Sequence, residues 1–219
     1  MRRALISAAM VVAACGGSSA TELPLAEVLA TAGSQFDALD SVRFSIEVDG
    51  VPVFFDNEGT LAATAADGQY SAPGSFQALV DVTAFGLATQ LGAISVGEDR
   101  WVTNPVTGEW DLLAIGTGFD PLVLFDPADG VGATVGNLDA TLVSFGSRYH
   151  IRGTVGGPTV KVLTAGLVEE GELDVDLFID ADSLQIVELA FDTRSEEGVS
   201  SWTISFSEFD EPVTIEPPA

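Results

Sequence analysis

The clearest strand pattern of the chain lies in LDVDLFIDADSLQIVELAFDTRSEEGVSSWTISFS, residues 173–207. Apolar side chains alternate with aspartates over residues 173–177, the chain turns over residues 180–183, and residues 184–191 lead back. Residues 202–206 then alternate large apolar side chains with threonine and serine. Strict alternation gives each strand one apolar and one wetted face, which is typical of an antiparallel sheet with its core on one side.

The same period of two occurs in the first half of the chain. Apolar and polar residues alternate over residues 42–48, and the pair Asp49-Gly50 is a hairpin signal that predicts a second strand over residues 51–63. Further strands are expected over residues 68–71, 78–85, 88–96, 100–103, 140–145 and 148–155. Together with the strands of residues 173–207, these give roughly nine to eleven strands.

Helices are expected at the start and in the middle of the chain, not after each strand. Apolar residues recur at steps of three and four over residues 24–39, which predicts the first helix. Two Asp-Pro pairs predict two short helices within residues 120–136, and Pro158 begins another over residues 157–167. Grouped strands with few helices indicate an α+β fold rather than a βαβ arrangement.

The N-terminus has the features of a bacterial lipoprotein signal. Arg2 and Arg3 precede an apolar run that is too short to span a bilayer, and Val12-Ala13-Ala14-Cys15 matches the lipobox, which is cut before the cysteine. An ordinary secretory signal is the alternative. It is disfavoured because Cys15 is the one cysteine of the chain and has no partner for a disulfide.

Cleavage before Cys15 divides the chain into three parts. Residues 1–14 are the signal peptide, residues 15–22 the acylated cysteine and a flexible tether, and residues 23–219 a single domain. Two or three acyl chains, at about 0.8 kcal/mol per buried methylene, hold a protein stably at a membrane. We therefore expect lipidation of Cys15 and a lipid-anchored protein on the extracytoplasmic face of the cell membrane.

The composition combines an apolar chain with an acidic surface. Hydrophobic residues make up 47% and charged residues 19%, and 33 Asp and Glu oppose eight Lys and Arg, for a formal net charge of −25. Such a surface repels nucleic acid and anionic lipid headgroups. We expect a monomer with no nucleic-acid partner, and any lipid that it handles must be held mainly through apolar contacts.

A search for catalytic residues finds no constellation. His150 is the one histidine, and it shares a strand face with Arg148 and Arg152. No base partner for a serine is identifiable, and a zinc site would have one nitrogen ligand at most. The face is typical of a solvated cross-strand stripe of ion pairs. The alternative is that Arg148 and Arg152 meet a phosphate or sugar headgroup.

Other candidate sites are equally weak. The aspartates of residues 174–182 lack the EF-hand spacing, so a wetted strand face explains them better than calcium. The glycines of residues 130–132 are not followed by the Gly-Lys-Ser/Thr of a phosphate loop. The three tryptophans are separate in the sequence, and we expect them at core or rim positions; they are Trp101, Trp110 and Trp202. We expect no catalytic residue, metal or cofactor, and binding rather than turnover.

The chain resembles the LppX/LprG family of mycobacterial cell-envelope lipoproteins, over nearly all of its mature length and in order. The residues that carry the resemblance are the lipobox, the first helix, Trp101-Val102-Thr103, Trp110, Phe119-Asp120-Pro121, residues 125–130, residues 149–153, residues 178–184 and residues 202–209. The resemblance implies a large curved antiparallel sheet, a half-barrel, whose concave face is covered by helices around a hydrophobic cavity. It also implies binding of acylated lipids or glycolipids and their transport across the cell envelope. The implied fold is similar to that of the periplasmic lipoprotein carriers. The strong acidity departs from the family pattern.

A sheet with one apolar face needs a cover, and a loosely packed cover leaves a dry cavity that suits acyl chains. The candidate wall residues are the inward apolar positions, and the alternative for each of them is ordinary core. They are Phe44, Ile46, Val48, Leu173, Val175, Leu177, Trp202, Ile204 and Phe206.

Three classes of function remain open at this point. The leading hypothesis is a lipid-binding or lipid-transferring lipoprotein. The second is a structural or interaction module of the envelope with no ligand, and the third is a hydrolase that would need His150 or an acid pair in a cleft.

Overall fold

The computed structural model describes residues 22–218 apart from 55–58, 85, 114–119 and 170. The signal peptide and Cys15 lie outside these residues. Within them, twelve strands form one antiparallel sheet in the order β7-β6-β5-β4-β3-β1-β12-β11-β10-β9-β8, with β2 paired to β3. The strands are β1 (Ser41–Gly50), β2 (Val53–Phe54), β3 (Leu61–Ser71), β4 (Ser75–Ala84), β5 (Leu87–Val96), β6 (Asp99–Thr103), β7 (Trp110–Leu112), β8 (Ala140–Phe145), β9 (Arg148–Gly156), β10 (Glu172–Asp180), β11 (Ile186–Ser195) and β12 (Gly198–Ser207).

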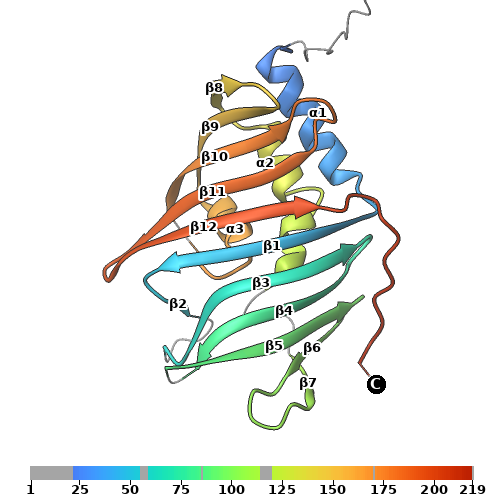
Figure 1. The fold of residues 1–219 in the computed structure, drawn as a ribbon, viewed down its shortest axis with the longest axis vertical. Helices are drawn as coiled ribbons and strands as arrows, with labels where there is room; N and C mark the ends of the chain where they lie inside the picture. Colours follow the sequence, from blue (N-terminus) through green and yellow to red (C-terminus); the bar gives the residue numbers. More distant parts are fainter. Residues whose placement is uncertain (1–21, 55–58, 85, 114–119, 170, 219) are drawn as a thin grey trace, which may run out of the picture.

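The sheet is open and curved, and helices cover one of its faces (Figure 1). We call the covered face the inner face and the opposite one the outer face. The centre of the sheet is the pairing of β1 with β12, where Phe44 lies opposite Phe206 and Ile46 opposite Ile204. These four side chains are at most 4% exposed, so the alternation of the sequence has become one buried and one wetted face. The predicted α+β half-barrel is confirmed.

The first helix lies on the inner face. α1 (Leu25–Asp37) starts after Pro24 and buries Val28, Leu29, Ala32 and Phe36, which lie on one side of the helix. It packs mainly against α2, and it also contacts β11 and, through Phe36, Phe206 of β12. The predicted helix over residues 24–39 is confirmed with ends that differ by one or two residues.

Three shorter helices complete the cover: η1 (Pro121–Phe125), a 3-10 helix, α2 (Val131–Gly136) and α3 (Pro158–Leu163). η1 contacts β4, and α3 contacts β9. α2 approaches α1 closely at Gly33 and Gly132, where a Cβ on Gly33 would come within 2.9 Å of the backbone nitrogen of Gly136. Asp120 caps η1 as expected, because its carboxylate accepts the N–H of Leu122.

Two expectations from the sequence are wrong in detail. The second strand expected over residues 51–63 is instead the two-residue β2, and β3 begins only at Leu61. β1 pairs with β12 up to Gly50 but with β3 only up to Glu47, so β1 does not fold back as a hairpin. The second Asp-Pro pair starts a turn rather than a helix: Asp126 accepts the N–H groups of Ala128 and Asp129, and α2 begins after it.

Candidate functional site

The nine predicted wall residues share the inner face. Eight of them are at most 5% exposed, whereas Val48 is partly buried and packs against the core. The eight are Phe44, Ile46, Leu173, Val175, Leu177, Trp202, Ile204 and Phe206. Trp202 also donates its indole N–H to the hydroxyl of Thr193 at 2.9 Å. The structure thus brings the predicted residues together, and their contact with a lipid remains a prediction.

The inner face has two unlike halves. On the neighbouring strands β1, β12, β11, β10 and β9, the inner face carries large side chains such as Trp202, Leu177 and Ile151. On β3, β4 and β5 it carries several small ones, because Gly68, Ala78 and Ala93 lie opposite one another across the three strands. Small side chains leave room above the sheet, so something else must fill the space over this half.

The Phe44 ring of β1 covers Gly68, and Phe125, the last residue of η1, lies beside that ring. The Phe125 ring stacks on Tyr70 of β3 with centroids 4.1 Å apart, and it also contacts Phe36 of α1 at 5.7 Å. Phe44 and Phe206 complete the cluster at 5.8 and 6.3 Å. One side chain of a five-residue helix therefore covers the meeting point of β1, β3 and β12. The sequence analysis expected this short helix but did not select Phe125 or Tyr70 as site residues.

An apolar hollow opens where the sheet splits. Beyond Glu47, β1 no longer pairs with β3, and the gap between the two strands forms a hollow of about 370 Å³. This volume lies at the lower end of the roughly 300–1,000 Å³ usual for ligand pockets. Val48, one of the predicted wall residues, belongs to its lining. The lining also includes Val51, Pro52, Phe54, Ala62 and Ala63.

A second hollow, of about 430 Å³, lies between α2, α3 and the end of β9. It is the larger of the two, but Asp129, Asn137 and Asp139 are among its lining residues. Acyl chains gain free energy by leaving water for apolar surface. The hollow between β1 and β3 is therefore the better candidate for an acyl chain.

The inner face also carries one ion pair near its β7 edge. Arg100 of β6 lies opposite Ser95 of β5, and Ser95 lies opposite the buried Phe76 of β4, so all three share the inner face. The guanidinium of Arg100 donates to the carboxylate of Asp120 at 2.6 Å. The two side chains are 21% and 17% exposed. The sequence analysis did not select either residue as part of a binding site.

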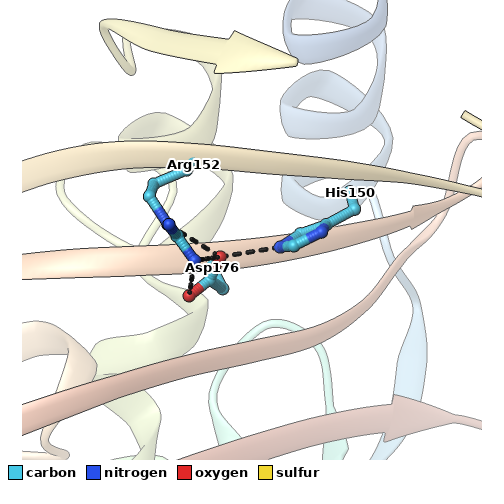
Figure 2. Close-up of polar contacts among 3 residues, drawn as sticks. All are labelled: His150, Arg152 and Asp176. Atoms are coloured by element: carbon cyan, nitrogen blue, oxygen red, sulfur yellow. Dashed lines mark hydrogen bonds and ion pairs between the residues drawn. The ribbon is translucent and has the colours of Figure 1, made fainter. Parts of the chain in front are cut away.

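The predicted stripe of His150, Arg148 and Arg152 lies on the outer face, away from the interior. Figure 2 shows His150 and Arg152 converging on Asp176. His150 and Arg152 both contact Asp176 of β10 at 2.7 Å, and His150 stacks on Phe178 at 4.6 Å. Burial acts to raise the pKa of Asp176, but hydrogen bonds from His150 and Arg152 outweigh it and hold that pKa below its ordinary value.

Arg148 continues this stripe and lies 3.9 Å from Glu188. The geometry is that of cross-strand ion pairs on a wetted face. A headgroup role for Arg148 and Arg152 remains a prediction, and it would require a ligand on the outer face. The expected turn aspartate, Asp180, accepts hydrogen bonds from the backbone of Asp182 and Ser183, which explains it without calcium.

Two surveys bear on other classes of site. In the part of the chain that the structure describes, no three His, Cys, Asp or Glu side chains are grouped so that they could hold a metal ion. Among the described helices, none has the length and apolar character needed to cross a membrane.

Comparison with known proteins gives a consistent picture. The model of the family described as LppX_LprAFG lipoprotein matches residues 25–215. Among solved structures, LprF from Mycobacterium bovis is 19% identical with a TM-score of 0.66, over 89% of this chain and 97% of LprF. The Mycobacterium tuberculosis lipoprotein LppX is 18% identical with a TM-score of 0.56, over 88% of this chain and 98% of LppX. No curated protein sequence matches the chain significantly.

Proposed function

The chain belongs to the LppX_LprAFG lipoprotein family, and on this premise we propose that it binds acylated lipids or glycolipids in its apolar interior and carries them across the cell envelope. The family membership confirms the resemblance seen in the sequence. The identity of the cargo class and the transport role are our inference from the interior of the sheet.

The observation that carries the proposal is the small-residue half of the inner face and the Phe125 ring at its border. Gly68, Ala78 and Ala93 give this half small side chains, and the Phe44 ring of β1 lies over Gly68. Phe125 of η1 stacks on Tyr70 beside them. If η1 moves, an acyl chain can replace the Phe125 ring against the same apolar surface. An acyl chain and the Phe125 ring gain free energy at the same rate, about 25 cal/mol per Å² of apolar area removed from water.

The hollow between β1 and β3 offers a route to that space. It opens at the end of the strands, and its lining includes Val48 and Ala63, which lie on the inner face. An acyl chain that enters there would meet apolar side chains along its length. We therefore propose this hollow as the entrance and the space under Phe125 as the binding site.

Anchoring at the membrane is part of the proposal. Residues 1–14 would be removed as a signal peptide, and Cys15 would carry the acyl chains on the extracytoplasmic face of the cell membrane. The described chain begins beside β9, where the N–H of Leu23 donates to the hydroxyl of Tyr149 at 2.8 Å. The eight residues from Cys15 to Glu22 span at most about 25–30 Å when extended. The tether would thus keep this end of the domain close to the bilayer.

We propose a carrier and not an enzyme. His150 lies on the outer face, and its ring is engaged with Asp176 and Phe178 rather than with a serine. A carrier needs an apolar space with a movable cover, and such a space is what the inner face and η1 offer.

The proposal is tested by filling the space. Ala78→Trp places a large ring on the inner face, while Ala190→Trp places the same ring on the outer face of β11. We expect Ala78→Trp to reduce binding of a fluorescent diacyl lipid at least tenfold, with the circular dichroism spectrum unchanged. Ala190→Trp should bind like the wild type. Equal binding by both variants would contradict the proposed site.

A further inference from the structure

The ion pair between Arg100 and Asp120 differs from the other described ion pairs because it lies on the inner face. Of the six Lys and Arg residues in the part of the chain that the structure describes, Arg100 alone points to the inner face. Arg43, Arg148, Arg152 and Arg194 lie at outward positions of their strands, and Lys161 of α3 pairs with the exposed Glu169. Placing an ion pair on an apolar face is costly unless further hydrogen bonds compensate for the lost water.

Ser95 provides a second, independent observation. Its side chain is fully buried directly across from Arg100, and its hydroxyl has no hydrogen-bond partner among the described residues. A buried hydroxyl without a partner is costly, and nearly all such groups in folded proteins are satisfied. A hydroxyl on the same face as Arg100 and directly opposite it suits a binding site for a polar ligand group.

We infer that Ser95, Arg100 and Asp120 recognise the hydroxyl and ester oxygens of an uncharged lipid headgroup, such as a glycerol or a sugar. This inference rests on the proposed function and adds to it the place where the polar end of the lipid is held. The three side chains differ in solvent exposure: Arg100 and Asp120 are about one-fifth exposed, whereas Ser95 is fully buried. The headgroup sits at the rim near β6, and the acyl chains extend inward over β4 and β3.

The chemistry of the three groups selects an uncharged ligand. A ligand hydroxyl can donate to the Asp120 carboxylate and accept from Arg100, and an ester carbonyl can accept from Ser95. An arginine side chain has five N–H donors, and the bond to Asp120 uses one of them. A phosphate would also be attracted to Arg100, but Asp120 already balances that charge. The net charge of −25 opposes an anion as well.

The test compares three cargoes in one sample. The acylated protein, purified from its host in a mild detergent, is incubated with glucosyl-dioleoylglycerol, dioleoyl phosphatidic acid and the hydrocarbon squalane in equal amounts. Native mass spectrometry then measures the ratio of the three bound forms. We expect the wild type to favour the glucosyl lipid at least tenfold over each of the other two.

Two variants locate the preference. Ser95→Ala keeps the fold, because it removes a buried group without a described partner, and it should lower the preference over squalane about fivefold, equivalent to about 1 kcal/mol. Replacing both charges, Arg100→Leu with Asp120→Asn, should remove most of the preference and leave squalane binding unchanged, because an asparagine side chain can still cap η1. The matched control replaces the outer-face pair, Arg152→Leu with Asp176→Asn, and should bind like the wild type.

The outcomes separate this inference from the proposed function. If no lipid binds to any form, the proposed function fails. If the three lipids bind but their ratios are the same in the wild type and in both site variants, this inference alone is overturned. A preference for phosphatidic acid that depends on Arg100 would also overturn it, since the site would then recognise anions.

Discussion

Phe125 of η1 stacks on Tyr70 of β3, with ring centroids 4.1 Å apart and ring planes 9° from parallel. This contact joins a short helix of the cover to the half of the sheet that has small side chains. Under the proposed function, Phe125 is the part of the interior that a ligand would replace.

Phe125→Ala should destabilise the free protein and increase its capacity for lipid. The ring is partly buried, so we expect a loss below the about 3–5 kcal/mol of a fully buried phenylalanine. Urea unfolding measures the loss, and saturation with a fluorescent diacyl lipid measures the capacity. Phe178→Ala removes a ring from the outer face and should leave the capacity unchanged. A Phe125→Ala variant with wild-type capacity would show that the ring does not occupy the binding space.

Gly68→Ala should lower the free energy of unfolding by about 1–3 kcal/mol, as overpacking in a core usually does. An added Cβ would overlap the Phe44 ring and come within 2.8 Å of the backbone oxygen of Gln77. The backbone oxygen cannot move away without disturbing the pairing of β3 with β4. Gly74→Ala is the control, since nothing lies within 4 Å of a Cβ there. Equal unfolding midpoints for the two variants in urea would contradict the packing described for Phe44.

Asp180 should make stability depend on pH. The backbone N–H of Ser183 is the main cause that holds the pKa of Asp180 below its ordinary value of 3.8, with the Ser183 hydroxyl and Asp182 N–H adding to it. A lowered folded-state pKa contributes stability above the unfolded-state value, and this contribution is lost as the pH falls through the folded-state pKa.

The corresponding measurement is the difference in free energy of unfolding between the wild type and Asp180→Ala at several pH values. We expect a difference at pH 7 that shrinks steadily as the pH falls below about 4. Asp182→Ala is the matched control, because Asp182 takes part in these hydrogen bonds through its backbone N–H and not through its side chain. A difference for Asp180→Ala that does not change with pH would mean that the charge of the carboxylate does not stabilise the turn.

Much of the sheet could be predicted because its strands alternate strictly. Tyr149 and Ile151 are apolar and their neighbours are charged, so the sequence alone indicates that Arg148 and Arg152 point away from the core, as the structure has them. Over β6 the alternation fails, since four of its five residues are partly buried. The inward direction of Arg100 follows only from its register with β5, which no local pattern encodes.

The cover was harder to predict than the sheet for a similar reason. A capping carboxylate before a proline identified Asp120 as the start of η1. The partners of Phe125, however, come from α1, β1, β3 and β12, which are brought together only by the complete fold. The hollow between β1 and β3 was missed because the Asp49-Gly50 pair predicted a hairpin where β1 instead continues along β12.

Cys15→Ala tests the anchor. The variant should lose acylation and cleavage by the lipoprotein signal peptidase, since the cysteine sulfur carries the diacylglycerol that this peptidase requires. Intact-protein mass spectrometry of the native protein should show a mature N-terminus at Cys15 with the mass of two or three acyl chains. A native protein without acyl chains, with its N-terminus elsewhere, would contradict the anchoring proposal.

The most direct test of lipid binding is native mass spectrometry of the protein isolated from its own host, with no lipid added. The account predicts an additional mass equal to one uncharged lipid of two or three acyl chains, which dissociates on activation and is reduced in Ala78→Trp but not in Ala190→Trp. A mass equal to that of the acylated chain alone, in wild type and variants, would contradict it and would favour an interaction module of the envelope with no ligand.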